Sequence, residues 1–244
     1  MTKDYTQSLK QFQKKAGISF KDITILETAF THRSYLNEIT RQKSGKQNKN
    51  TDRSHNERLE FLGDAVLELV VTDYLYKEYP DATEGDLTSY RAALVNAVML
   101  GGIAESLGMN ECLLLSRGEA KDTGRARSTI LANTFEAVVG ALYLDQGVES
   151  VSTFVSRHVM PHMEEVLKSG TWRDAKSRFQ EHAQGKYGIT PSYETVRAEG
   201  PDHDRHFVVA LSLEDTVLAE GEGKSKQEAE QDAAQKALRE EEKK

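Results

Sequence analysis

Apolar residues recur at helical spacing through the first two thirds of the chain and alternate with polar residues in much of the last third. Spacing of three and four residues is typical of a helix packed on one face, whereas strict alternation is typical of a half-buried strand. The first part is predicted to contain helices over residues 5–16, 22–30, 55–76, 83–108, 128–144 and 148–167. The last part is predicted to contain helices over residues 174–187 and 225–238 and strands over residues 192–198, 206–213 and 217–221.

The order of these elements predicts two domains of different class. The first, over residues 1–168, is expected to be all α-helical, and the second, over residues 174–244, is expected to be a small α+β domain with the order α-β-β-β-α. Residues 169–173 lie between them and are expected to form a linker. A length of 244 residues fits two domains, since one domain typically has about 100–200 residues.

An acidic stripe runs along the predicted helix over residues 55–76. Glu57, Glu60, Asp64 and Glu68 fall on one side of this helix, and most of its other positions are apolar. Asp and Glu are rarely buried unless something compensates their charge, and a divalent cation would do so. The alternative is a solvated charged face. We favour the cation because the flanking positions are apolar, and we expect the stripe to lie in the core.

A second helix, within residues 128–144, carries groups that complete such a site. Asn133, Glu136 and Gly140 share one stripe of it, and Gly63 lies in the acidic helix. Facing glycines let two helices approach closely, so the two stripes are expected to converge. Such a site supports phosphoryl chemistry, so neither a side-chain nucleophile nor a small-molecule cofactor is expected. The oxygen ligands expected for Mg²⁺, with Mn²⁺ as a substitute, are Glu60, Asp64, Asn133 and Glu136.

Two further acidic residues and a basic segment have open roles. Glu57 and Glu84 either orient the metal ligands from a second shell or cap their helices, and the sequence does not favour one role. Residues 40–54 contain several Lys and Arg but no apolar side chain. This segment is expected to be a surface loop that either contacts a phosphate backbone or is only solvated.

Composition narrows the class of protein. The net charge of -7 and the isoelectric point near 5.6 argue against a general nucleic-acid binder, for which a value above about 9 is typical. Any contact with nucleic acid must therefore use local basic patches. The single cysteine, Cys112, excludes an internal disulfide and is expected to be buried and inert. Without a signal sequence or an apolar stretch of about 20 residues, a cytoplasmic location and no membrane association are expected.

At the acidic helix the sequence resembles bacterial ribonuclease III. The signature of that family is matched by the run NERLEFLGDAVL, residues 56–67, and the resemblance covers essentially the whole chain. It implies a Mg²⁺-dependent endonuclease that cleaves double-stranded RNA, including rRNA precursors and other structured transcripts. It also implies 5′-phosphate and 3′-hydroxyl ends with short 3′ overhangs. Finally, it implies a homodimer, in which Phe61 packs across the dimer interface.

The same resemblance assigns roles to individual residues. It makes Glu60, Asp64 and Glu136 metal ligands and places the catalytic role on Asp64 and Glu136. Many members of the family have Asp where this chain has Asn133. An amide oxygen still binds Mg²⁺ but brings no charge, so we expect weaker metal binding with retained activity. Asn133 is also the feature that favours the alternative, a cleavage-silent protein of the same fold that only binds double-stranded RNA.

The last part of the chain resembles a double-stranded-RNA-binding domain. The resemblance rests on the α-β-β-β-α order, on GPDH at residues 200–203 and on GEGKSK at residues 221–226. A helix that begins beside lysines is suited to bind phosphate, and contacts in the minor groove reach the 2′-hydroxyls of RNA. The residues that match RNA contacts are Ser177, Gln180, Glu181, His203, Lys224 and Lys226.

This domain is less basic than the resemblance suggests. Gln227 and Glu230 stand where lysines are common, and residues 173–244 contain 12 Lys and Arg against 16 Asp and Glu. Contacts with phosphate release counterions, so such binding weakens as salt is added. We therefore expect modest, salt-sensitive affinity for RNA from this domain alone.

Overall fold

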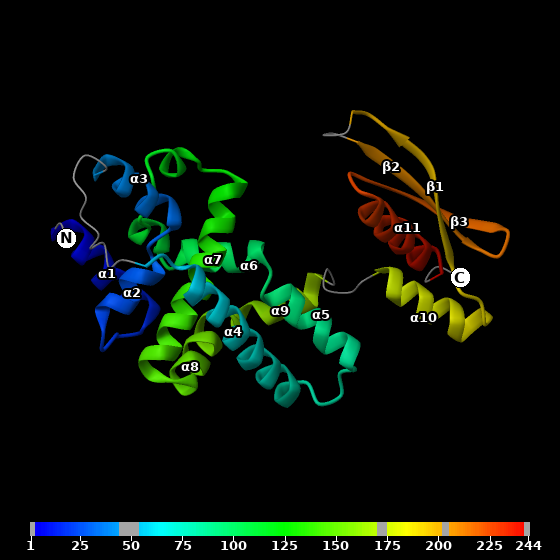
Figure 1. Cartoon of the computed structure of the whole chain (residues 1–244). Helices are drawn as coiled ribbons and strands as arrows, with labels where there is room; N and C mark the ends of the chain where they lie inside the picture. Colours follow the sequence, from blue (N-terminus) through cyan, green and yellow to red (C-terminus); the bar gives the residue numbers. More distant parts are fainter. Residues whose placement is uncertain (1–2, 44–53, 170–174, 202–204, 242–244) are drawn as a thin grey trace. The chain divides into compact units, whose positions relative to one another are not determined.

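The computed structural model describes residues 3–43, 54–169, 175–201 and 205–241. The chain forms two compact units, Met1–Trp172 and Arg173–Lys244, and each is described by itself (Figure 1). As far as the described residues go, the first unit is helical, and the second combines two helices with three strands. The predicted fold class, an all-α domain followed by an α-β-β-β-α domain, is therefore confirmed.

The helices of the first unit pack around one central helix, α7. They are α1 (Lys3–Ala16), α2 (Ile23–Ala29), α3 (Arg33–Lys43), α4 (Glu57–Glu78), α5 (Glu84–Leu94), α6 (Ala97–Ser106), α7 (Arg125–Gln146), α8 (Val148–His158) and α9 (Met163–Ser169). Every residue from Ala137 to Leu142 of α7 is buried. A helix that is apolar on all sides needs neighbours on all sides. These are α2, α4, α6 and α8, which pack against α7 (Figure 1).

The helices α4 and α7 cross with their backbones in close contact. A Cβ atom added to Gly63 of α4 would overlap the backbone carbonyl oxygen of Glu136. One added to Gly140 of α7 would overlap the carbonyl oxygen of Leu59. Only glycine leaves room for the facing backbone at these two positions. The close approach predicted from the two glycines is therefore confirmed.

The N-terminal segment contains one helix more than its pattern predicts, which is α3. It is separated from α2 by a strand-like bridge between Thr31 and Leu114. The N–H of Leu114 donates to the carbonyl oxygen of Phe30 at 2.9 Å, and the N–H of His32 donates to that of Leu114 at 3.1 Å. This contact joins distant parts of the chain, so local spacing does not reveal the break.

The polar segment that follows is partly helical. The sequence predicts an irregular loop over residues 40–54, but α3 continues to Lys43. The prediction is therefore wrong for residues 40–43. Residues 44–53, which hold most of the basic side chains of this segment, lie outside the described residues.

The single helix predicted over residues 83–108 is two helices, α5 and α6. Asn96 lies at the break, where its side-chain nitrogen donates to the carbonyl oxygen of Ala93 at 2.8 Å. Its side-chain oxygen accepts from the N–H of Met99 at 2.9 Å, as a favoured N-cap residue does. The apolar spacing continues through the break and conceals it. The helix predicted over residues 148–167 is likewise divided, into α8 and α9.

The second unit is an antiparallel sheet packed against two helices. Its elements are α10 (Ala175–Tyr187), β1 (Ser192–Glu199), β2 (His206–Leu213), β3 (Thr216–Gly223) and α11 (Lys226–Glu241). The strand order is β1-β2-β3, and Val209 of the central strand pairs with Thr195 and Gly221. A Cβ atom at Gly221 would overlap the backbone of Ala229 and Ala233. This glycine therefore lets α11 lie directly against the sheet.

The helix α11 also covers the outer edge of β3. The carboxylate of Asp232 accepts from the N–H of Glu222 at 2.9 Å. The ammonium of Lys236 donates to the carbonyl oxygen of Glu220 at 2.9 Å. Uncovered strand edges promote association with other chains, so these side chains protect the sheet. A separate apolar core, which includes the buried Phe179, forms between the sheet and the helices.

Two expectations from the composition concern Cys112 and membrane-spanning helices. Cys112 is buried, as predicted, and burial raises the pKa of its thiol to about 12, which is consistent with an inert cysteine. Within the described ranges, no single helix is both long and apolar enough to cross a membrane. The bent pair of α5 and α6 meets that test jointly, by length and composition only.

Replacing Gly63 with Ala is expected to destabilise the first unit by about 3 kcal/mol, because the new Cβ atom would force the α4 and α7 backbones apart. The matched control is Gly102→Ala on α6, where no atom lies within 4 Å of the added Cβ. That change should leave stability unchanged or raise it by about 0.5–1 kcal/mol. Urea unfolding of both variants measures the difference, and equal midpoints would contradict the close crossing.

Candidate active site and nucleic-acid interface

The carboxylates predicted to bind metal lie on both sides of the α4–α7 crossing. Glu60 and Asp64 occupy successive turns of α4, and Glu136 lies on α7. Burial, followed by the charges of Asp64, Glu60 and Glu68, raises the pKa of Glu136 to about 7. Burial, followed by the charges of Glu57 and Asp64, also raises the pKa of Glu60. The structure therefore brings Glu60, Asp64 and Glu136 close enough to repel one another.

The acidic side of α4 is more exposed than its sequence predicts. Along the stripe only Glu60 is half-buried, so the expectation that the stripe lies in the core is wrong. The apolar neighbours of the stripe face solvent as well, since Phe61 is 82% exposed and Leu69 is 63% exposed. The α4 helix therefore presents large apolar side chains as well as carboxylates on its exposed side.

The donor set fits a divalent cation in its chemistry. Three carboxylates and the amide oxygen of Asn133, which is half-buried one turn before Glu136, are hard oxygen ligands of the kind that Mg²⁺ binds. Burial and the neighbouring carboxylates raise the pKa of Glu136, and a cation would relieve the repulsion among these carboxylates. In the part of the chain that the structure describes, no three His, Cys, Asp or Glu side chains are arranged as a formed site for one ion. The support for a metal site is therefore the electrostatic coupling and the ligand types.

The two residues with open roles have different surroundings. The carboxylate of Glu57 lies 3.6 Å from the guanidinium of Arg33 and 3.6 Å from Nδ1 of His55. Glu84 lies in the first turn of α5, where its carboxylate accepts from the hydroxyl of Thr88 at 3.2 Å. The charge of Glu57 contributes to the raised pKa of Glu60, so Glu57 belongs to the neighbourhood of the acidic cluster, whereas Glu84 supports the start of its own helix. A second-shell role for either residue stays a prediction.

Sequence reasoning missed the group that fixes the start of α4. Asn56 is buried, its N–H donates to the carbonyl oxygen of Thr31 at 2.9 Å, and its carbonyl oxygen accepts from the N–H of Glu60 at 2.9 Å. Beside this contact, the N–H of Ser34 donates to Nδ1 of His32 at 3.3 Å, so that nitrogen is unprotonated. Burial lowers the pKa of His32, which favours the neutral form of the ring. The sequence signal for the contact made by Asn56 was a polar residue directly before an amphipathic helix.

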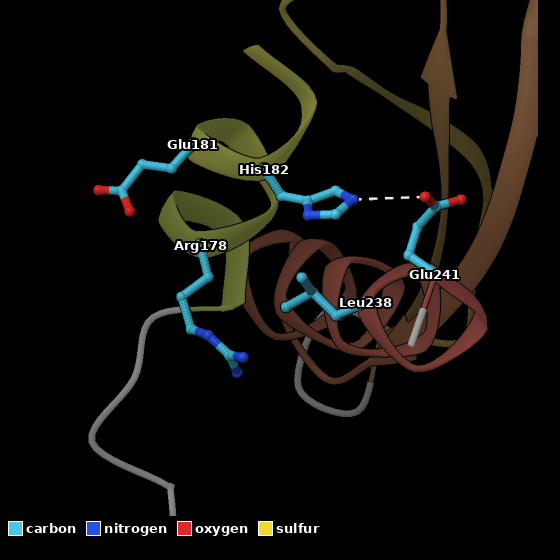
Figure 2. A pocket seen from close by; sticks show the side chains of 5 residues that line it. All are labelled: Arg178, Glu181, His182, Leu238 and Glu241. Atoms are coloured by element: carbon cyan, nitrogen blue, oxygen red, sulfur yellow. Dashed lines mark hydrogen bonds and ion pairs between the residues drawn. The ribbon is translucent and has the colours of Figure 1, made fainter. Parts of the chain in front are cut away.

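The helix α10 presents three of the predicted RNA contacts on one side. Ser177, Gln180 and Glu181 are exposed and follow one another at spacings of three and one, which places them on neighbouring positions of one face. Figure 2 shows Glu181 projecting from α10 on the side away from Glu241. His203 lies outside the described residues. The exposed polar face of α10 is therefore available to a groove of nucleic acid.

Another side of α10 is tied to the end of α11. The carboxylate of Glu241 accepts from the ammonium of Lys186 at 2.8 Å and from the hydroxyl of Tyr187 at 2.6 Å. It also lies 3.3 Å from Nε2 of His182, and Figure 2 marks this contact with a dashed line. The Glu241 side chain is only 5% exposed, so these partners compensate a buried charge. The hydrogen bond to Glu241 raises the pKa of Lys186. Together these contacts hold α10 against α11.

The N-terminus of α11 carries the two predicted phosphate contacts, Lys224 and Lys226, both exposed. The hydroxyl of Ser225 accepts from the N–H of Glu228 at 3.1 Å, and the Glu228 carboxylate accepts from the N–H of Lys224 at 2.8 Å. This reciprocal arrangement fixes the first turn of the helix. The two lysines therefore lie at the positive end of a helix, where phosphate binds favourably.

In a comparison with known proteins, each unit matches a different family. Residues 22–163 match the family model described as Ribonuclease-III-like, and residues 175–241 match the Double-stranded RNA binding motif. Proteins named Ribonuclease 3 are 42% identical in Bdellovibrio bacteriovorus, over 95% of both chains, and 44% identical in Bacillus cereus, over 96% of this chain and 92% of that one. A solved ribonuclease III nuclease domain from Campylobacter jejuni is 36% identical, with a TM-score of 0.53, over 63% of this chain and 96% of that one.

These matches define a two-domain nuclease whose second unit is of the kind that binds double-stranded RNA. The chain belongs to the ribonuclease III family and is an endoribonuclease specific for double-stranded RNA. The resemblance drawn from the run over residues 56–67 is therefore confirmed. The match at the second unit confirms the other resemblance, which rests on the α-β-β-β-α order.

Without a bound cation, the protein is expected to be more stable near pH 5 than near pH 8. Glu136 binds its proton with a pKa of about 7 when folded and of 4.5 ordinarily, so this contribution is complete below about 4.5 and lost as the pH rises through about 7. Glu136→Gln should reduce the dependence. Thermal unfolding in a chelator measures it, and an unchanged pH dependence in the variant would show that Glu136 is not the group responsible.

Proposed function

We propose that this chain hydrolyses the phosphodiester bonds of double-stranded RNA with Mg²⁺ held by Glu60, Asp64, Asn133 and Glu136. The observation that carries the proposal is the burial of Glu136 at the α4–α7 crossing beside the carboxylates of Asp64 and Glu60, which together raise its pKa to about 7. A divalent cation is the natural partner of such a cluster, and Mn²⁺ is expected to substitute for Mg²⁺. The proposal requires no small-molecule cofactor.

The site residues have roles that follow from their positions. Asp64 and Glu136 lie on facing helices and are proposed as the catalytic pair, which would help to hold the cation. When bound, the cation supplies activation of a water molecule and stabilisation of the leaving oxygen. Glu136 gives up its proton as the site is filled, since a carboxylate ligand must be ionised. Glu57, which lies near Arg33, is proposed to help orient Glu60.

A homodimer is part of the proposal. It is supported by the exposed apolar side of α4, where Phe61 is 82% exposed, and by the hollow that Leu69, Tyr143 and Leu144 help to line. The solved nuclease domain from Campylobacter jejuni is described as having a region involved in dimer formation. Two sites, one from each copy, would cut opposite strands. The expected products have 5′-phosphate and 3′-hydroxyl ends with short 3′ overhangs.

The second unit is proposed to hold the duplex. The exposed face of α10 would lie in a minor groove, and the lysines at the start of α11 would contact phosphates. His203 is proposed as a further contact. Recognition of this kind spans about 16 base pairs and depends mainly on the shape of the duplex. Processing of rRNA precursors and other structured transcripts in the cytoplasm is proposed from the family resemblance.

Replacing Glu136 with Gln tests the proposed site. The rate of cleavage of a perfect RNA duplex is expected to fall by at least about 100-fold, because this ligand set would hold the cation that stabilises charge in the transition state. Binding of the duplex should persist, since the second unit is unchanged. Glu105→Gln, an exposed carboxylate on α6, is the matched control and should cleave normally. Full activity of the Glu136 variant would overturn the proposed site.

Replacing Asn133 with Asp tests the fourth ligand. The Mg²⁺ concentration for half-maximal cleavage is expected to fall on the order of threefold to tenfold, because a charged ligand replaces a neutral one. Asn110→Asp adds the same charge at an exposed position of the first unit and should leave the requirement unchanged. A metal titration of the cleavage rate compares the two variants. No shift for the Asn133 variant would mean that this residue does not bind the metal.

A further inference from the structure

We propose that the ion pair between Lys176 and Glu230 is a positioning element for RNA binding, which sets the separation of the two contact surfaces of the second unit. This inference rests on the proposed binding of duplex RNA by that unit. It assigns Glu230, which stands where lysine is common in such domains, a role other than contact with phosphate. It also predicts whether RNA binding becomes weaker or tighter when the carboxylate of Glu230 is removed.

The pair connects three elements of the unit. The ammonium of Lys176, in the first turn of α10, donates to the carboxylate of Glu230 on α11 at 2.7 Å. The same ammonium lies 4.6 Å from the centre of the Tyr193 ring on β1. The backbone N–H of Lys176 donates to the side-chain oxygen of Gln231 at 3.4 Å. The start of α10 is therefore held to the second turn of α11 by adjacent side chains.

The position of this pair relates it to the RNA contacts. Lys176 precedes Ser177, the first predicted contact on α10, and Glu230 follows Lys226, the second predicted phosphate contact, by one helical turn. A shift at the pair therefore changes the distance between the α10 face and the α11 N-terminus. The duplex presents its minor groove and its phosphates at fixed separations, so both contacts form together only if this distance is right.

The surroundings of Glu230 argue against simple repulsion of RNA. Its carboxylate is 26% exposed and is neutralised by Lys176, whose own side chain is 39% exposed. Pairs with this exposure contribute little to the stability of a fold, so the unit does not need this pair in order to fold. A rigid arrangement of two contact surfaces does strengthen binding, because less freedom is lost when RNA binds.

The two explanations of Glu230 predict opposite results for Glu230→Gln. If the carboxylate only repels phosphate, its removal should tighten the binding of RNA. If it positions the two surfaces, its removal should weaken binding by about threefold to tenfold. The slope of binding against salt should stay unchanged, because no phosphate contact is lost.

The experiment measures binding of a perfect RNA duplex to the full chain, in the Glu136→Gln background and with a chelator, so that the RNA is not cut. Glu194→Gln removes an exposed carboxylate on β1 and is the matched charge control, expected within about twofold of the parent. Lys176→Glu combined with Glu230→Lys rebuilds the pair in reverse and should restore binding to within about threefold. Melting temperatures of all variants report whether the unit is folded.

Each outcome decides the inference. Weaker binding by Glu230→Gln, with an unchanged melting temperature, an unchanged salt slope and recovery in the reversed pair, supports it. Equal or tighter binding by Glu230→Gln overturns it, as does a loss that the reversed pair does not recover. A salt slope that falls by about one in Glu230→Gln shows that a phosphate contact is lost with the carboxylate, and it also overturns the inference. If the parent chain does not bind the duplex, the proposed function fails first, and this result is distinct from the others.

Discussion

The close crossing of α4 and α7 is the constraint on which the nuclease unit depends. Gly63 and Gly140 place each backbone against a carbonyl oxygen of the other helix, and any larger residue would separate them. The contact that completes the core around α7 therefore also sets how near Glu60 and Asp64 come to Glu136. This proximity is unfavourable without a cation, since burial and like charges raise the pKa of Glu136. Groups whose ionisation the fold disfavours are common at functional sites.

The net charge of the second unit understates how well this unit suits RNA. The unit has more acidic than basic residues, but several of its carboxylates are used internally. Glu241 binds groups of α10, Asp232 covers the edge of β3, and Glu230 pairs with Lys176. Paired carboxylates repel a phosphate backbone less than free ones do. Lys224 and Lys226 remain exposed at the start of a helix, where their charge adds to the helix dipole.

Most of the fold could be predicted from the sequence because the signals are local. Helical spacing, strand alternation and glycine turns gave the order of the elements and the change of class near residue 174. The errors occurred where a distant contact decides a boundary or where a local cap interrupts a continuous apolar pattern. The separate helix α3 depends on the bridge between Thr31 and Leu114, and the break between α5 and α6 depends on a cap by Asn96 within a continuous apolar pattern. The exposure of the acidic stripe depends on which faces of α4 other elements cover.

The sequence by itself determined the type and order of the site residues. The run over residues 56–67 and the stripe with Asn133 and Glu136 are readable without coordinates, because residue identity and helical period are sufficient. Only the tertiary structure decided how strongly these groups interact, since the pKa of Glu136 reflects burial and charges from another helix. It also decided that Glu230 pairs with Lys176, because the two residues lie 54 positions apart and meet only when α10 packs against α11.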